Sequence, residues 1–153
     1  FLASTKSYAN FELQLKFRIT TEENVSPDLH RLNAGIQFRS QRIPDHHEVK
    51  GYQADISPEY DGHLYDESRR RKFLAQPLPA VMKQAQDAVG TDGWNTYRIR
   101  AEGRRIQLWF NGVKTVDYIE TDESIEHQGI IALQIHGGMR AIIAYKDIKI
   151  REL

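Results

Sequence analysis

Apolar and polar side chains alternate along most of the chain. In residues 11–19 the odd positions hold apolar residues and the even positions hold polar or charged ones. Side chains of an extended strand point to opposite faces in turn, so this pattern predicts a strand with one buried face. The same alternation predicts further strands in residues 33–40, 51–57, 94–102, 104–110, 113–119, 130–136 and 141–150.

Turn-forming residues separate these segments. Glu102-Gly103 lies between two alternating runs, and Asn111-Gly112 is a pair that favours a tight type I′ hairpin. Helix-forming composition is confined to residues 80–88, which glycines follow at positions 90 and 93. Many short strands with regular turns predict an all-β fold, either a two-sheet antiparallel β-sandwich or a barrel.

Length and charge limit the number of domains and the kinds of partner that we expect. The 153 residues predict one domain, residues 1–153, and the 21 basic and 21 acidic side chains cancel. Without a net positive charge we expect no nucleic-acid partner, and no apolar run is long enough to span a membrane. The chain has no cysteine, which excludes disulfides. It starts at Phe1 without a methionine, so we expect a mature or trimmed chain.

Three of the predicted strands carry unusual polar faces. If the apolar positions, such as Tyr52, Ala54 and Ile56, fill the space between two sheets, the alternate positions lie on an outer surface. Those positions hold Asn33, Gly35, Gln37, Arg39, Gln53, Asp55, Gln134 and His136. Amide, carboxylate and guanidinium groups suit sugar hydroxyls, which both donate and accept hydrogen bonds. The alternative is an ordinary solvated sheet face.

Residues 62–75 form a second candidate segment. Tyr65 and Asp66 precede a run of four basic residues, 69–72, within what we expect to be a loop or a single helical turn. One interpretation is a salt-bridged surface loop. The other places Tyr65 and Asp66 at the edge of the polar face, with an arginine orienting the carboxylate. Tyr65, Trp94 and Trp109 could each stack on a sugar ring.

Taken together and in order, these segments resemble the 3-keto-disaccharide hydrolase family. The motifs that carry the resemblance are NAGIQFRS, GYQADI, GHLYDESRRRKFLA, WNTYRIRAEGRRIQLWFNGVKTVDY, GIIALQIHGG and YKDIKIREL. The resemblance covers nearly the whole chain. It implies a concanavalin A-like jelly roll, which is a two-sheet β-sandwich, and an exported bacterial protein that is periplasmic or extracellular. It also implies activity on glycosides whose sugar carries a ketone at carbon 3.

A ketone at carbon 3 acidifies the hydrogen on carbon 2, so a base can form an enolate that expels the group on carbon 1. On this chemistry we assign His136 as the general base or as a metal ligand, with Asp55 or Asp66 as the acid or orienting carboxylate. Arg39 would stabilise the enolate oxygen. The predicted hydroxyl-binding residues are Asn33, Gln53, Tyr65 and Gln134, and Trp109 is the predicted stacking residue.

Two other functions stay open at this stage: a carbohydrate-binding module without catalysis, and a structural or protein-interaction domain. No cofactor is required by the sequence. A divalent cation of the calcium type is compatible with this kind of fold, but no calcium-binding loop motif is present, and we assign no metal ligand set. The sequence does not indicate the oligomeric state.

Overall fold

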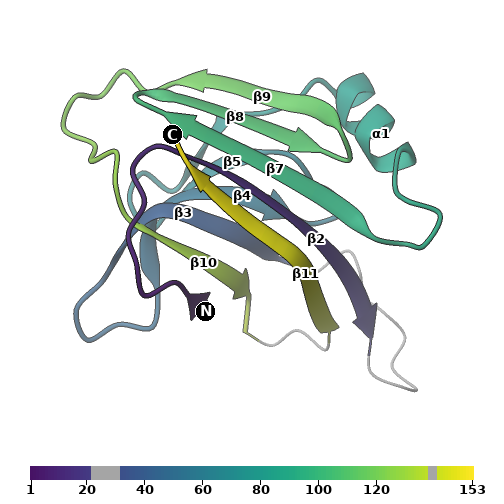
Figure 1. Ribbon diagram of the computed structural model, residues 1–153, viewed down its shortest axis with the longest axis horizontal. Coiled ribbons are helices and arrows are strands. Elements are labelled where there is room, and N and C mark those ends of the chain that lie inside the picture. Colours follow the sequence, from purple (N-terminus) through teal and green to yellow (C-terminus); the bar gives the residue numbers. More distant parts are fainter. Residues whose placement is uncertain (22–31, 138–140) are drawn as a thin grey trace.

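Two antiparallel sheets pack face to face in a β-sandwich (Figure 1). The computed structural model describes residues 1–21, 32–137 and 141–153. The first sheet has six strands in the order β1-β10-β3-β4-β5-β6. Their bounds are β1 Leu2–Ala3, β10 Ile130–Ile135, β3 Ala34–Arg42, β4 Val49–Ile56, β5 Leu64–Glu67 and β6 Lys72–Ala75.

The second sheet has five strands in the order β11-β2-β7-β8-β9. Their bounds are β11 Ala141–Glu152, β2 Phe11–Thr21, β7 Asn95–Glu102, β8 Arg105–Phe110 and β9 Val113–Ile119. All the strands predicted from alternation are present, and their division between two sheets confirms the sandwich rather than the barrel. Strands β1, β5 and β6 were not predicted; β5 and β6 form a hairpin within the segment expected to be a loop or helical turn.

The core lies between the sheets and is made by the apolar positions of both. Phe11, Phe17 and Phe110 come from the five-stranded sheet, and Phe38 and Tyr52 come from the six-stranded one; all are at most 1% exposed. The Phe38 and Tyr52 rings stack with centroids 5.7 Å apart. Burial of these large rings is the main stabilising contribution expected for a sandwich of this size.

One turn and one helix form where the sequence predicts them. Asn111 and Gly112 have φ angles of 48° and 80°, as the type I′ turn between β8 and β9 requires. Helix α1, Pro79–Asp87, begins with a proline in its first turn and packs beside β9 at one end of the sandwich (Figure 1). No helix in the described ranges is long and apolar enough to cross a membrane.

Candidate functional site

Two rows of polar side chains cross the outer face of the six-stranded sheet. Strand pairing aligns Gln134 on β10, Gly35 on β3 and Asp55 on β4 in one row. The neighbouring row runs through Gln37, Gln53, Tyr65 and Phe73 on β3, β4, β5 and β6. These residues alternate with core residues, so the strand period that was read from the sequence brings them to one surface.

A pocket of about 480 Å³ opens over these rows. It brings together six of the residues predicted from the sequence, and adds carboxylates and aromatic rings. The six are Asn33, Gln53, Asp55, Tyr65, Gln134 and His136; the additional lining residues include Glu48, Glu67, Tyr60 and Phe73. Amides, carboxylates, two phenols and an imidazole thus surround one cavity of a size suited to a small ligand.

A hydrogen-bonded chain of amides fixes Asp55. The Gln37 amide donates to Gln53 Oε1, and Gln53 Nε2 in turn donates to Asp55 Oδ1. Gln53 reaches this position by lying over Gly35, where a Cβ would come within 2.6 Å of the Gln53 side chain. Glycine at position 35 is therefore required by the close approach of Gln53, and a larger residue there would displace the partner of Asp55.

Asp55 is only 6% exposed. Burial raises the pKa of the Asp55 carboxyl to about 7, the hydrogen bond from Gln53 opposes this, and the negative charges of Glu67 and Asp61 raise it further. A carboxyl that titrates near neutral pH can both take and return a proton under ordinary conditions. Asp55 is therefore the best-placed proton-transfer group of the pocket.

The same pKa predicts how stability depends on pH. The unfolded chain releases the Asp55 proton near pH 3.8 and the folded chain near pH 7, so the free energy of unfolding should fall as pH rises between these values. Asp55→Asn should remove this share, which amounts to a few kcal/mol by the usual conversion of pKa shifts. Urea unfolding of both proteins at pH 4 and pH 8 measures it. An equal pH dependence in the two would contradict the assignment.

Aromatic rings form one wall of the pocket. The Phe73 ring lies 5.2 Å from the centroids of both Tyr60 and Tyr65, and 5.3 Å from that of His63. Such a cluster offers an apolar plate to the C–H face of a sugar ring, with the tyrosine hydroxyls at its edge. Tyr65 is the aromatic residue that the sequence placed in the site; its partners Tyr60 and Phe73 were missed.

The opposite wall holds Gln134, Asn33 and His136. Gln134 is 8% exposed, yet its Oε1 has no hydrogen-bond partner in the described part of the chain. A buried polar group without a partner is costly unless a ligand or water satisfies it, so this amide is available to a ligand. The His136 amide donates to the Asn33 carbonyl at 2.9 Å, which holds these two exposed residues side by side at the rim.

Arg39 does not lie on this face, which corrects the sequence-based expectation. A β-bulge between Phe38 and Gln41, with Arg39 at φ 47°, reverses the alternation and turns the arginine toward the other sheet. There it is 1% exposed and donates to the carbonyls of Ala9 and Gly103 at 2.8 and 2.7 Å. Arg39 therefore joins the two sheets at one end and cannot contact a ligand in the pocket.

Arg39→Ala should consequently affect stability and leave the pocket intact. The substitution removes a buried guanidinium and its charged hydrogen bonds to two backbone carbonyls, so we expect the free energy of unfolding to fall by about 3 kcal/mol. Chemical denaturation measures this, with Arg105→Ala, an exposed arginine, as the control. Ligand binding lost by a fully stable Arg39→Ala protein would show that the arginine serves the site after all.

Asp66 is also removed from the pocket. Because residues 64–67 form a strand, Tyr65 faces the pocket and Asp66 faces the interior, where it is fully buried. Arg69 Nε lies 2.8 Å from Asp66 Oδ1, and Arg70 bridges Asp66 and Glu120. The segment is therefore a buried ion-pair network, and the expectation that Asp66 lies at the edge of the polar face is wrong.

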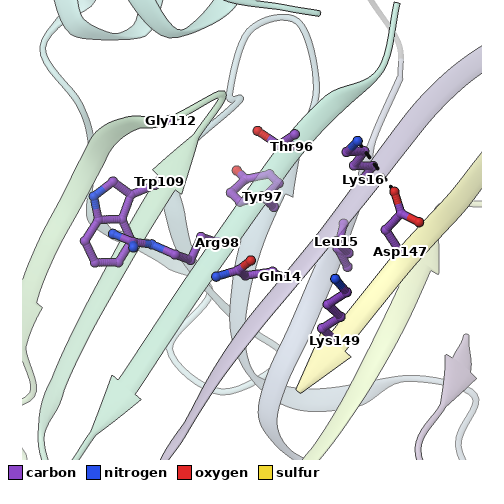
Figure 2. Close-up of a pocket in the computed structure, with 10 residues that line it drawn as sticks. All are labelled: Gln14, Leu15, Lys16, Thr96, Tyr97, Arg98, Trp109, Gly112, Asp147 and Lys149. Atoms are coloured by element: carbon purple, nitrogen blue, oxygen red, sulfur yellow. Dashed lines mark ion pairs between the residues drawn. The ribbon is translucent and has the colours of Figure 1, made fainter. Parts of the chain in front are cut away.

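Trp109 lies on the other sheet. It lines a shallow depression of about 560 Å³ on the outer face of the five-stranded sheet, together with Gln14, Arg98 and Lys149 (Figure 2). It cannot stack on a ligand held beside Asp55, because the whole sandwich separates the two surfaces. The sequence showed that Trp109 alternates outward but not which sheet its strand joins.

Glu48 and Glu67 are the carboxylates that the sequence analysis missed. Ser68 binds both, through its hydroxyl to Glu48 Oε2 at 2.6 Å and its backbone N–H to Glu67 Oε1 at 3.0 Å. The signal for Glu67 was present, since Tyr65 and Glu67 alternate with buried residues as a strand requires. No group of three or more His, Asp or Glu in the described ranges is placed to hold a metal ion.

Comparison with known proteins agrees with this fold. Residues 1–151 match the family described as the 3-keto-alpha-glucoside-1,2-lyase-like domain. A Parabacteroides distasonis ATCC 8503 protein described as a candidate glycosyl hydrolase aligns with a TM-score of 0.66 and 16% identity, over 99% of this chain and 75% of its own. The carbohydrate-binding module CBM66 from Bacillus subtilis aligns with a TM-score of 0.66 and 16% identity, over 97% and 78%. None of the curated proteins compared with the chain matches it.

Proposed function

The chain belongs to the family of 3-keto-alpha-glucoside-1,2-lyase-like domains, and from this premise we propose that it cleaves 3-keto-glycosides in the pocket above Asp55. The observation that supports this most is the meeting of a buried carboxyl of raised pKa with free amides and an aromatic wall around one cavity. Elimination needs one group to remove a proton, one to return a proton, and donors for the enolate. The pocket contains a candidate for each.

In the first step Asp55 takes the proton from carbon 2 as its carboxylate. The electron pair of that C–H bond forms the double bond to carbon 3, and the ketone oxygen becomes the enolate. Burial makes this carboxylate a stronger base than an exposed one, because the neutral product is favoured away from water. The sequence-based scheme gave the role of general base to His136. Asp55 is more deeply buried and has a raised pKa, so we assign the role to Asp55 instead.

In the second step the bond from carbon 1 to the leaving oxygen breaks, and the enolate electrons form the double bond between carbons 1 and 2. His136 at the rim donates a proton to the leaving oxygen. The proton held by Asp55 then returns to carbon 2 as water adds its hydroxyl to carbon 1, and the remaining proton of that water restores the protonated form of His136. The sum is hydrolysis of the glycoside, with no change in oxidation state.

The amides of Gln134 and Asn33 are the donors best placed for the enolate oxygen. The Gln134 side chain has an unpaired end, and rotation of its amide can turn the NH2 group to a ligand oxygen. Gln53 is committed to Gln37 and Asp55, so it positions the base rather than the substrate. Tyr65 and its neighbouring rings would cover the apolar face of the sugar.

The second candidate is a carbohydrate-binding module without catalysis. Among the described residues, no lysine or arginine lines the pocket, so the developing enolate would meet no guanidinium and no side-chain ammonium. An enolate without a cation beside it is less well stabilised, and this favours a module that binds sugar without cleaving it.

Incubation with a 3-keto-glucoside and with the matching unoxidised glucoside separates the two candidates. We expect release of the aglycone only from the keto compound, because only the ketone acidifies carbon 2. Calorimetric binding of both sugars without any release would favour the binding module. Neither binding nor release would refute both.

A further inference from the structure

The outer face of the five-stranded sheet carries a second row of ligand-competent side chains. Strand pairing aligns Trp109 on β8, Arg98 on β7, Gln14 on β2 and Lys149 on β11. Figure 2 shows Arg98 lying along the Trp109 ring, with Gln14 beside it and Lys149 beyond. Adjacent strands lie about 4.8 Å apart, so the backbones of Arg98 and Lys149 are separated by roughly 10 Å.

Arg98 is held ready for an anion. Its guanidinium carbon lies 3.6 Å from the centroid of the Trp109 ring, which fixes the plane of the group. No ion pair among the described residues involves Arg98 or Lys149, whereas Arg100 and Arg105 on the same face both have carboxylate partners. Because Arg98 has no carboxylate partner among the described residues, the paired N–H donors of its planar guanidinium can bind the carboxylate of a ligand.

Further cations lie on one side of the row, toward Trp94. Lys146 and Arg18 lie over the ring of Trp94, at 4.0 and 4.8 Å from its centroid, and neither forms an ion pair within the described ranges. Lys16 lies 3.5 Å from Asp147, the acidic residue at the edge of the depression. Although the protein has no net charge, this end of the sheet is locally positive.

We propose that this row is a second saccharide-binding site, specific for sugars that carry a carboxylate. Arg98 and Lys149 pair with the acid groups, Trp109 supplies an aromatic edge and the Gln14 amide contacts hydroxyls. Gln14 already donates one amide hydrogen to Glu12 at 3.1 Å, which leaves its carbonyl oxygen to accept from a hydroxyl. The site is distinct from the Asp55 pocket, whose carboxylates would repel such a ligand.

A sugar acid suits this surface better than a nucleic acid. Glu12, Asp117 and Asp147 interrupt the positive charge along the sheet, so no continuous stripe is available to follow a phosphate backbone. A short row of one guanidinium, one amide and one ammonium instead matches a few sugar units. The zero net charge also provides no long-range attraction for a polyanion.

Titration with tetragalacturonate, followed by tryptophan fluorescence and calorimetry, tests the proposal. The two tryptophans of the chain, Trp94 and Trp109, both contact cations of this face, so a fluorescence change locates the ligand there rather than in the pocket. We expect Arg98→Ala to weaken binding at least tenfold and Arg98→Lys to weaken it less, since the charge is kept. Arg105→Ala, on the same face but paired with Asp117, should change affinity less than twofold.

Three results would overturn the proposal. Tetragalacturonate that binds no tighter than neutral maltotetraose would remove the role of charge, and an equal loss in Arg105→Ala would show diffuse attraction. Tighter binding of a thymidine oligonucleotide of equal charge would replace the sugar assignment with a nucleic-acid one. Each readout is a binding measurement on this face, so it is independent of keto-glycoside cleavage.

Discussion

Replacement of Asp55 by asparagine is expected to lower kcat/KM for cleavage of a 3-keto-glucoside by about three orders of magnitude. Asparagine keeps the shape of the side chain and can still bond to the Gln53 amide through its oxygen, but it cannot accept the proton from carbon 2. Since the substitution also removes a buried group that resists ionisation, the protein should not lose stability above pH 7. The loss would therefore be chemical rather than structural.

The control is Asp117→Asn, the same substitution in an exposed ion-pair cluster on the other sheet. It should leave kcat/KM unchanged. An Asp55→Asn protein that keeps more than a tenth of the activity would rule out Asp55 as the base. In that case His136, the base expected from the sequence, would be the next residue to replace.

Asp66→Ala is expected to produce a large loss of stability. Asp66 is fully buried and bonded by Arg69 and Arg70, while Arg70 also binds Glu120 with an Nη2–Oε2 distance of 2.6 Å. Removing one partner of a buried network leaves the others without compensation. The arginine side chains are about one fifth exposed, so water can relieve part of the cost, and we expect a loss of about 3 kcal/mol.

For a chain of this length that loss corresponds to a decrease in Tm of about 6–12 °C. Thermal unfolding followed by circular dichroism measures it. Asp87→Ala, which breaks an exposed pair with Lys83, should shift Tm little. The ion pair between Arg70 and Glu120 also explains the pKa of Glu120. Burial alone would raise that pKa, but Arg70 and the Tyr52 hydroxyl hold it at about 2. A wild-type Tm for Asp66→Ala would contradict this account of the network.

Alternation of apolar and polar residues predicted most of the strands and which side chains of the pocket face outward. Gln53, Asp55 and Gln134 face outward for the same reason that Tyr52 and Ala54 face inward. This argument depends only on the period of a regular strand, and it holds wherever the strand is regular. The pocket also required that β10, β3 and β4 be neighbours, which the alternation does not specify.

The wrong predictions arose where a strand is irregular, where a short strand was not recognised, or where the sheet that a strand joins was unknown. At Arg39 one extra residue in β3 turns the side chain inward, and nothing in the sequence marks an arginine for a positive φ. At Asp66 a run of charges was taken for a loop, although it contains a short hairpin with one face buried. Trp109 was assigned to the wrong surface because pairing between distant strands decides which sheet a strand joins.

The central claim is that the polar pocket of the six-stranded sheet receives the sugar. A crystal structure of Asp55→Asn grown with a 3-keto-glucoside tests it most directly, since the inactive protein should retain the ligand. The account predicts the sugar ring against Tyr65 and Phe73, with carbon 2 facing residue 55 and an oxygen bonded to Gln134. A sugar bound on another surface, with this pocket filled only by water, would contradict it.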